Sequence, residues 1–257
     1  MEATIKTPTA ALRGAPRHNA ERVDEALHGW QVTILSQSGD FYHIRTDYGY
    51  TGHIHKDDLS LAAPPPNPRR IAQNFADIVA APTVQGDVIT SLPRGALVEF
   101  KGIADNHSRI ALADGREAFI RNDFLEIPKK NLTRQNLVDN AMKYLGSPYR
   151  WGGKTPRGID CSGLTFMAYH LCGLNIWRDA HHKDGYPLAK IDLKRAKPGD
   201  LLYFPGHVAM LLENDKIIHS AYANGIVKVQ NLENSRELLE NLLYCTSAFP
   251  TNSPFAT

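Results

Sequence analysis

An internal repeat occupies the first half of this 257-residue chain and limits how that half can fold. Residues 15–59 align with residues 81–125 at a constant offset of 66 residues and without a gap. Matching positions carry identical residues: Ala15-Pro16 with Ala81-Pro82, Gly29 with Gly95, Val32 with Val98, Ile44 with Ile110, Gly49 with Gly115, Ile54 with Ile120, Asp57 with Asp123 and Leu59 with Leu125. Repeated sequence at a fixed offset indicates repeated structure, so we expect two copies of one small fold.

Each copy has the pattern of short β-strands. Apolar and polar residues alternate in stretches such as Val32–Ile34 and Phe41–Arg45, and turn residues such as Ser38-Gly39-Asp40 and Asp114-Gly115 separate these stretches. Alternation with a period of two is typical of strands that bury one face, and Gly beside Asp is typical of tight turns. We therefore predict two small β-barrels.

The second half has a different pattern. Thr133 can cap a helix whose apolar residues recur from Leu137 to Leu145, and Gly146 can end it. A more apolar helical pattern follows from Leu164, and short apolar strands come after it, at residues 201–204, 208–212, 216–221 and 226–229. Two helices followed by an antiparallel sheet predict an α+β fold.

These patterns divide the chain into four segments. The prolines near residue 65 favour an extended, stiff linker that holds the two barrels at a set distance. The predicted segments are the first β-barrel (1–62), the proline-rich linker (63–68), the second β-barrel (69–128) and the α+β domain (129–257).

Composition narrows the class of partner. The chain has 29 Lys and Arg against 27 Asp and Glu, a balance that predicts binding to neither nucleic acid nor an anionic membrane. Three cysteines are too few and too scattered for a disulfide scaffold. The first residues lack a basic segment followed by an apolar one, and a run of about 18 apolar residues does not occur. We therefore expect a soluble, cytoplasmic protein.

Cys161 is the candidate nucleophile. It follows a Gly-rich, aromatic loop and stands at the predicted start of the apolar helix, between Asp160 and Ser162. The first turn of a helix has unpaired N–H groups and the positive end of the helix dipole, and both favour a thiolate over a thiol. We therefore expect a lowered pKa for Cys161.

Two histidines are candidate partners for this thiol. A nucleophilic cysteine needs an imidazole to accept its proton and a further group to orient that imidazole, and His207 and His219 can fill these roles. A two-residue turn at Asn214-Asp215 would place the two rings on opposite faces of a hairpin. A bulge, a wider turn, or a position for His207 on the loop after Pro205-Gly206 would resolve this, and we favour the loop.

The same three side chains could instead bind zinc. The position of the cysteine at the start of a helix suits nucleophilic catalysis better, so we predict neither a metal nor another cofactor.

Five sequence blocks resemble the NlpC/P60 family of papain-like cysteine peptidases. They are Pro148-Tyr149-Arg150-Trp151-Gly152-Gly153, Asp160-Cys161-Ser162-Gly163-Leu164, Pro198-Gly199-Asp200-Leu201, His207-Val208-Ala209-Met210 and Ile218-His219-Ser220. The repeats resemble bacterial SH3 (SH3b) domains, most visibly in Gly29-Trp30-Gln31-Val32, Phe41-Tyr42-His43-Ile44-Arg45 and Gly49-Tyr50-Thr51-Gly52-His53-Ile54. The resemblance implies a papain-like NlpC/P60 catalytic domain preceded by two SH3b-like barrels, an α+β architecture.

The combination is similar to a branch of the family, the γ-D-glutamyl-L-diamino acid endopeptidases. This resemblance implies a cysteine endopeptidase that hydrolyses the γ-D-glutamyl-diamino acid bond of murein peptides with a free amino-terminal L-Ala, in cell-wall peptide recycling. Two alternatives are a secreted peptidoglycan hydrolase of the same chemistry and a non-catalytic SH3b protein that binds peptidoglycan.

The resemblance also implies a role for each motif residue. Cys161 is the nucleophile, His207 the base and His219 the orienting residue, while Tyr149 and the Cys161 backbone N–H stabilise the oxyanion. A further set of residues binds the substrate, with Asp160 and Ser162 at its ammonium group: Asp160, Ser162, Trp151, Arg178, Asp179, Tyr50 and Glu21. The chain departs from the family pattern at His181-His182, where members commonly have Gln.

Overall fold

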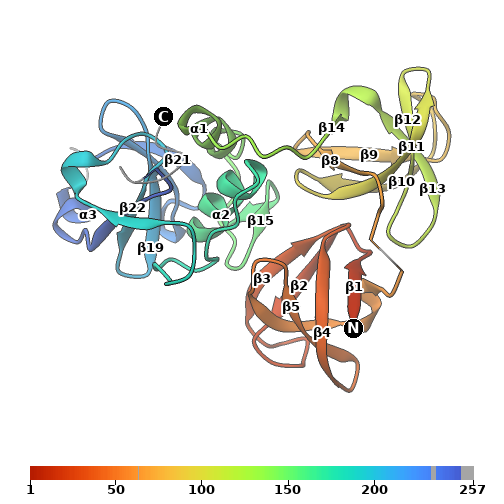
Figure 1. Cartoon of the computed structure of the whole chain (residues 1–257), viewed down its shortest axis with the longest axis horizontal. Helices are drawn as coiled ribbons and strands as arrows, with labels where there is room; N and C mark the ends of the chain where they lie inside the picture. The colour runs from red at the N-terminus through yellow and green to blue at the C-terminus, as the bar shows by residue number, and fades with distance from the viewer. Residues whose placement is uncertain (63, 233–235, 250–257) are drawn as a thin grey trace. The chain divides into compact units, whose positions relative to one another are not determined.

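The structure, a computed structural model of the chain, describes residues 1–62, 64–232 and 236–249. It divides into two compact units, Met1–Pro128 and Lys129–Thr257 (Figure 1). This boundary falls where the sequence predicts the α+β domain to begin. Residue 63, in the predicted linker, and residues 233–235 and 250–257, in the predicted α+β domain, lie outside the described residues.

The first unit contains two antiparallel sheets of seven strands each. The first sheet has the order β3-β2-β6-β5-β4-β1-β7, and its core includes Ile5, Leu12, Ile44 and Ile54, which are all fully buried. Its elements are β1 (Glu2–Ile5), β2 (Thr9–Arg13), β3 (Arg22–Leu27), β4 (Gln31–Ser38), β5 (Phe41–Thr46), β6 (Thr51–His55), the 3-10 turn η1 (Lys56–Asp58) and β7 (Leu59–Ser60).

The second sheet repeats the first element by element. Its order is β10-β9-β13-β12-β11-β8-β14, the same arrangement as in the first sheet. Its elements are β8 (Pro68–Ile71), β9 (Phe75–Val79), β10 (Val88–Pro93), β11 (Leu97–Ala104), β12 (His107–Ala111), β13 (Glu117–Arg121), η2 (Asn122–Phe124) and β14 (Leu125–Glu126). Apart from the end of β12, every bound lies 66 residues after its counterpart, so the structural repeat begins at residue 2, earlier than the aligned segment at residue 15.

The two sheets also share their irregularities. The register between β4 and β5 shifts between Ile34 and Ser36, and the register between β11 and β12 shifts between Phe100 and Gly102. A β-bulge increases the local twist of a strand and helps a sheet to curl. The same bulge therefore bends both sheets at equivalent positions.

Within the first unit, the backbones of the two barrels approach closely at Gly29. The Trp30 indole N–H donates to the Gly95 carbonyl over 2.9 Å, and the Leu97 N–H donates to the His28 carbonyl over 2.8 Å. Gly29 has a φ of +79°, and a Cβ at this position would lie 2.1 Å from the Leu97 carbonyl oxygen. The backbone approach therefore requires glycine at residue 29.

We predict that Gly29→Ala lowers the free energy of unfolding of the chain by about 2 kcal/mol or more. The positive φ alone costs about 1–2 kcal/mol in an L-residue, and the overlap with the Leu97 backbone adds to it. Gly39→Ala is the matched control, because Gly39 also has a positive φ but open space around a Cβ. Equal losses for the two variants in urea unfolding would contradict the close approach.

The second unit begins with two helices. Thr133 caps α1 (Arg134–Met142), and its hydroxyl accepts from the Asn136 N–H over 3.1 Å. Helix α2 (Cys161–Leu171) is buried at every position except His170, which fits its apolar sequence. It contacts α1 and the strands β19 and β20. The predicted first helix extends further than the observed one, because the chain turns after Met142.

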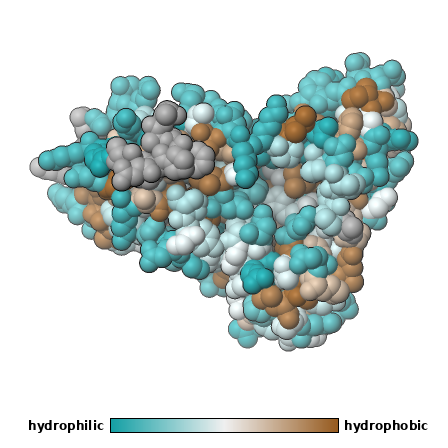
Figure 2. Space-filling model, viewed as in Figure 1, coloured by the Kyte–Doolittle hydropathy of each residue, from teal (hydrophilic) through white to brown (hydrophobic). Residues whose placement is uncertain are grey.

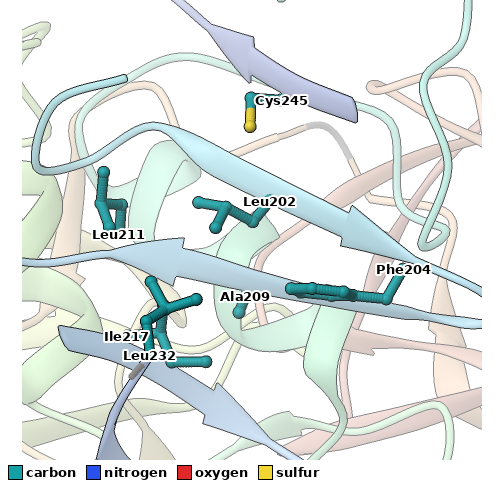
Figure 3. Close-up of a cluster of buried hydrophobic side chains, with 7 residues drawn as sticks. All are labelled: Leu202, Phe204, Ala209, Leu211, Ile217, Leu232 and Cys245. Carbon is teal, nitrogen blue, oxygen red and sulfur yellow. The ribbon is translucent and has the colours of Figure 1, made fainter. Parts of the chain in front are cut away.

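An antiparallel sheet of six strands follows, in the order β17-β22-β18-β19-β20-β21. Every residue of β18 is buried, so both faces of the sheet are covered. One face carries the cluster of apolar side chains in Figure 3, including Cys245, whose thiol is part of this core. The remaining elements of the unit are β15 (Lys154–Thr155), β16 (Gly158–Ile159), β17 (Ala189–Ile191), η3 (Leu193–Arg195), β18 (Leu201–Phe204), β19 (His207–Leu211), β20 (Lys216–Ser220), η4 (Tyr222–Asn224), β21 (Val227–Asn231), α3 (Arg236–Glu240) and β22 (Tyr244–Ser247).

The surface is mixed in polarity. On the face drawn in Figure 2, hydrophobic residues are scattered among hydrophilic ones. In the described part of the chain, none of the helices has the length and apolar character needed to span a membrane.

Candidate active site

The Asp160 carboxylate fixes the start of α2, where Cys161 is the first helical residue. Asp160 is the N-cap, and its Oδ1 accepts from the Gly163 N–H over 2.6 Å, while its Oδ2 accepts from the Gly152 N–H over 2.7 Å. An N-cap carboxylate satisfies helix donors that have no intrahelical partner. One side chain thus ties the Gly-rich loop to the helix that carries the candidate nucleophile.

The loop lies close against the first turn of the helix. A Cβ at Gly163 would lie 2.2 Å from the Gly153 carbonyl oxygen. Glycine is therefore required in the first turn of α2, since any larger residue would push the loop away from the thiol.

Arg178 is buried behind this cap. Its Nη1 lies 3.0 Å from Asp160 Oδ1 and 2.7 Å from the Ser162 Oγ, its Nη2 lies 3.0 Å from Asp160 Oδ2, and its side chain is 1% exposed. A guanidinium in this two-pronged geometry neutralises a carboxylate that has little access to water. The resemblance implies that Arg178 binds the substrate, but the structure places its guanidinium on Asp160 and Ser162 instead.

Burial has the largest effect on the pKa of the candidate nucleophile, Cys161. Cys161 is 7% exposed, and this burial, followed by the Asp160 charge, raises the pKa of its thiol to about 11 despite hydrogen bonds from the Val208 and Ser162 backbone N–H groups and the positive charge of Arg178. The expected lowering of the Cys161 pKa by the helix start is therefore wrong. Desolvation of a thiolate outweighs the stabilising N–H groups.

A three-residue turn brings the two histidines together. Met210 pairs with Ile218 and Leu212 N–H bonds to Lys216, so residues 213–215 form the turn between β19 and β20. This register places His219 opposite residue 209, on the same face as His207, and His207 Nε2 lies 3.0 Å from His219 Nδ1. Of the solutions that the sequence left open, the wider turn is the correct one, because His207 is the first residue of strand β19 rather than part of a loop.

Both rings favour their neutral forms. Burial, and then the neighbouring His219, lowers the pKa of His207 to about 4. Burial likewise lowers the pKa of His219, with a smaller contribution from the Lys228 charge. A neutral imidazole is a competent general base, because it has a free lone pair that can accept a thiol proton.

Tyr149 has the character of a hydrogen-bond donor near the thiol. Burial, and then the Cys161 charge, raises the pKa of its phenol to about 12, so the hydroxyl keeps its proton at neutral pH. Its backbone N–H is held by the Gly225 carbonyl over 2.7 Å, and its ring packs edge-on against Tyr222. These contacts fix the side chain that we predict to stabilise an oxyanion.

The other predicted substrate-binding residues are spread over both units. Trp151 lies on the Gly-rich loop and is 58% exposed, and Asp179 is half-buried after Arg178. In the first unit, Glu21 is exposed and Tyr50 is half-buried at the β5–β6 turn. The substrate roles of these four residues stay predictions.

Two amide side chains that the sequence patterns did not indicate contact His219. Asn224 Nδ2 lies 3.3 Å from His219 Nε2, and the Gln230 side chain is hydrogen-bonded to the His219 ring. Neither residue belongs to a recognisable motif, since Asn224 precedes a turn glycine and Gln230 fits a strand. Among the described residues, no group of three or more His, Cys, Asp or Glu side chains has an arrangement that could hold a metal ion.

A thiol at the start of a helix that packs on an antiparallel sheet, together with an ordered pair of imidazoles on that sheet, is the arrangement of a papain-like cysteine hydrolase. Comparison with known proteins supports this class. The NlpC/P60 family model matches residues 146–238, and the bacterial SH3 domain model matches residues 8–60.

Relatives extend the match to almost the whole chain. Dipeptidyl-peptidase 6 of Lysinibacillus sphaericus is 35% identical over 265 residues, which cover 96% of this chain and 97% of the relative. Gamma-D-glutamyl-L-lysine dipeptidyl-peptidase of Bacillus cereus is 26% identical over 251 residues, which cover 82% of this chain and 71% of the relative. A crystal structure of an NlpC/P60 family protein from Bacillus cereus shares the fold, with a TM-score of 0.83, 20% identity, and coverage of 97% of this chain and 100% of that one.

The chain therefore belongs to the NlpC/P60 family and is a peptidase. The predicted architecture, an NlpC/P60 catalytic domain preceded by two SH3b-like barrels, is confirmed. The SH3 model matches the first copy, and the identical strand order identifies the second copy as the same fold.

We predict that iodoacetamide modifies Cys161 slowly at pH 7 and about tenfold faster with each pH unit up to the pKa of about 11, because the thiolate is the reactive form. Mass analysis of the Cys161 peptide measures the rate, and the urea-unfolded chain supplies the control of an ordinary thiol. Fast, pH-independent modification of the folded protein between pH 6 and pH 8 would show instead a resting thiolate-imidazolium pair.

We predict that Arg178→Met lowers the free energy of unfolding by about 3–5 kcal/mol, because it leaves the buried Asp160 carboxylate without its counter-charge. Lys194→Met removes an exposed cation and is expected to change it by less than about 0.5 kcal/mol. Adding Asp160→Asn to Arg178→Met removes the unpaired charge and is expected to recover part of the loss. A loss of similar size in the Lys194 control would contradict the buried pair.

Proposed function

We propose that the protein hydrolyses the γ-D-glutamyl bond to a diamino acid in murein-derived peptides that carry a free amino-terminal L-Ala. The single observation that carries this proposal is the near-full-length alignment with Dipeptidyl-peptidase 6, which includes both SH3b copies as well as the catalytic domain. The name of the second relative, a γ-D-glutamyl-L-lysine dipeptidyl-peptidase, supports the choice of bond. A dipeptidyl-peptidase releases two residues from an amino terminus, so it must recognise that terminus.

The proposed reaction starts from the neutral pair. As the Cys161 sulfur attacks the γ-carbonyl carbon of D-glutamate, the thiol proton passes to His207. The carbonyl oxygen becomes an oxyanion, which the Tyr149 hydroxyl and the Cys161 backbone N–H stabilise. Each such donor is typically worth about 3 kcal/mol of activation free energy.

The tetrahedral intermediate then collapses. The carbon–nitrogen bond breaks, His207 gives its proton to the leaving amine of the diamino acid, and L-Ala-D-Glu remains bound to Cys161 as a thioester. Water, deprotonated by His207, attacks the thioester carbon, and the products are the free dipeptide and the regenerated thiol. The pKa of His207, lowered to about 4, keeps the base unprotonated across the neutral range.

If Asp160 binds the substrate ammonium, it must do so while it keeps its hydrogen bonds within the protein. Its two oxygens already accept from Gly152, Gly163 and Arg178, and the Arg178 charge balances its own. A substrate ammonium at Asp160 therefore gains less from charge than from hydrogen bonding. We propose that the Ser162 hydroxyl supplies part of that bonding, because it lies 3.3 Å from Asp160 Oδ1.

We also propose that the reaction belongs to cytoplasmic recycling of cell-wall peptides. A free alanine amine exists only after the peptide has been cut from the glycan, because in intact peptidoglycan this nitrogen is part of an amide bond. Selectivity for the free amine would favour released fragments over the assembled wall.

We predict that the protein releases L-Ala-D-Glu from L-Ala-γ-D-Glu-meso-diaminopimelate or from its L-Lys counterpart, and that it leaves the N-acetylated peptides intact. Acetylation removes the positive charge and one donor of the terminal amine, so the polar groups that bind it lose their partner. Mass analysis of the products measures the release. Equal cleavage of the acetylated peptides would favour a hydrolase of intact wall peptides.

The matched control compares two buried cysteines at opposite ends of helix α2. Cys161→Ala is expected to abolish release, while Cys172→Ala, at the C-cap of α2, is expected to retain it. A folded chain that binds peptidoglycan but cleaves none of these peptides would support the non-catalytic alternative.

A further inference from the structure

His219 is held on both ring nitrogens. Its Nδ1 lies 3.0 Å from His207 Nε2, and its Nε2 lies 3.3 Å from Asn224 Nδ2. The Gln230 side chain is also hydrogen-bonded to the ring. Because Nδ1 faces His207, Nε2 is the ring nitrogen that remains for Gln230. The protons of both histidines therefore depend on which amide atom faces this nitrogen.

Gln230 lies on the sheet, on the face from which the His219 ring projects. In the pairing of β20 with β21, His219 lies opposite Lys228 and Ile217 lies opposite Gln230, so Gln230 projects from the same face as His219. Asn224 ends η4, the short turn that connects these two strands. One amide thus comes from the sheet and the other from its connecting loop.

An acceptor at His219 Nε2 sets a productive order of protons. If an amide oxygen accepts the Nε2 proton of His219, Nδ1 of that ring is a bare acceptor for the Nε2 proton of His207. His207 then has its lone pair on Nδ1, the nitrogen that is left to take the thiol proton of Cys161. Every hydrogen bond along this chain has one donor and one acceptor.

A donor at the same nitrogen reverses the order. If the Asn224 amide N–H donates to His219 Nε2, the ring carries its proton on Nδ1 and donates it to His207 Nε2. His207 must then carry its own proton on Nδ1, so it offers the thiol a donor rather than a base. The two amides therefore favour opposite tautomers, and the productive one requires an oxygen.

We propose that Gln230 is a positioning residue of the active site, whose amide oxygen accepts the Nε2 proton of His219 and thereby holds both histidines in the tautomers that leave His207 able to deprotonate Cys161. The proposal rests on the proposed roles of Cys161 and His207. It adds a fourth residue to the chain of side chains behind the nucleophile, and it assigns Asn224 the opposing influence.

The first test removes the acceptor while keeping the shape. Gln230→Met is expected to lower kcat at least tenfold with little change in KM, because the Asn224 donor then sets the tautomers. Adding Asn224→Asp to this variant replaces the donor with a carboxylate, which can only accept, and is expected to restore most of the lost kcat. Circular dichroism confirms folding of each variant.

The second test keeps the acceptor and adds charge. Gln230→Glu is expected to retain kcat and to shift the acid limb of the kcat profile to higher pH, because a carboxylate beside His219 stabilises the protonated ring pair. The charged and titratable neighbours of His219 are His207 and Lys228, and the Lys228 ammonium reduces the shift without reversing its sign. This variant remains informative if Gln230→Met does not fold.

The outcomes separate the two proposals. Parental kcat in folded Gln230→Met, a loss that Asn224→Asp does not relieve, or an unshifted profile in Gln230→Glu would each overturn the role of Gln230. These results count only where Cys161→Ala is inactive in the same assay. Activity in Cys161→Ala would instead overturn the proposed catalytic mechanism.

Discussion

The arrangement of the catalytic domain depends on one buried carboxylate. Asp160 caps the helix that begins with Cys161, anchors the Gly-rich loop through the Gly152 N–H and pairs with the Arg178 guanidinium. A charge this deeply buried is tolerated because both of its oxygens are fully engaged. The loop, the helix start and the segment after the helix therefore meet at a single side chain. The position of the thiol follows from this contact rather than from the sheet alone.

Burial also determines the protonation states of Cys161 and His207. It raises the pKa of the Cys161 thiol and lowers the pKa of His207, so the resting pair is uncharged. In the proposed reaction, charge separation develops as the substrate reacts, when an oxyanion forms beside the Tyr149 hydroxyl. A site of this kind gains from donors that are already in place, because they need no reorganisation as the charge appears. The order of protons along the histidines becomes as important as their distances.

The fold could be predicted from the sequence where the signals are local. Alternating strands and turn glycines recur at a fixed offset, so the two barrels follow from the repeat, and the family motifs identify the catalytic domain. The pairing of His207 with His219 depends on the length of one turn, which the sequence leaves open. Tertiary burial causes the high pKa of Cys161 and the pairing of Arg178 with Asp160. Neighbouring residues in the sequence do not indicate this burial. Local chemistry was therefore predictable, and its electrostatic environment was not.

Because residues 213–215 form a three-residue turn, the position of His219 depends on whether the number of residues in this turn is odd or even. Its Asn214 and Asp215 have positive φ values, a conformation that suits the turn and little else. Loss or gain of one residue here would shift the pairing of β20 by one position and send the His219 ring to the other side of the sheet. A change of two residues would preserve the side while moving the ring along the strand. An insertion that most exposed loops absorb without effect would thus separate the two imidazoles, although every candidate catalytic side chain remained in the sequence.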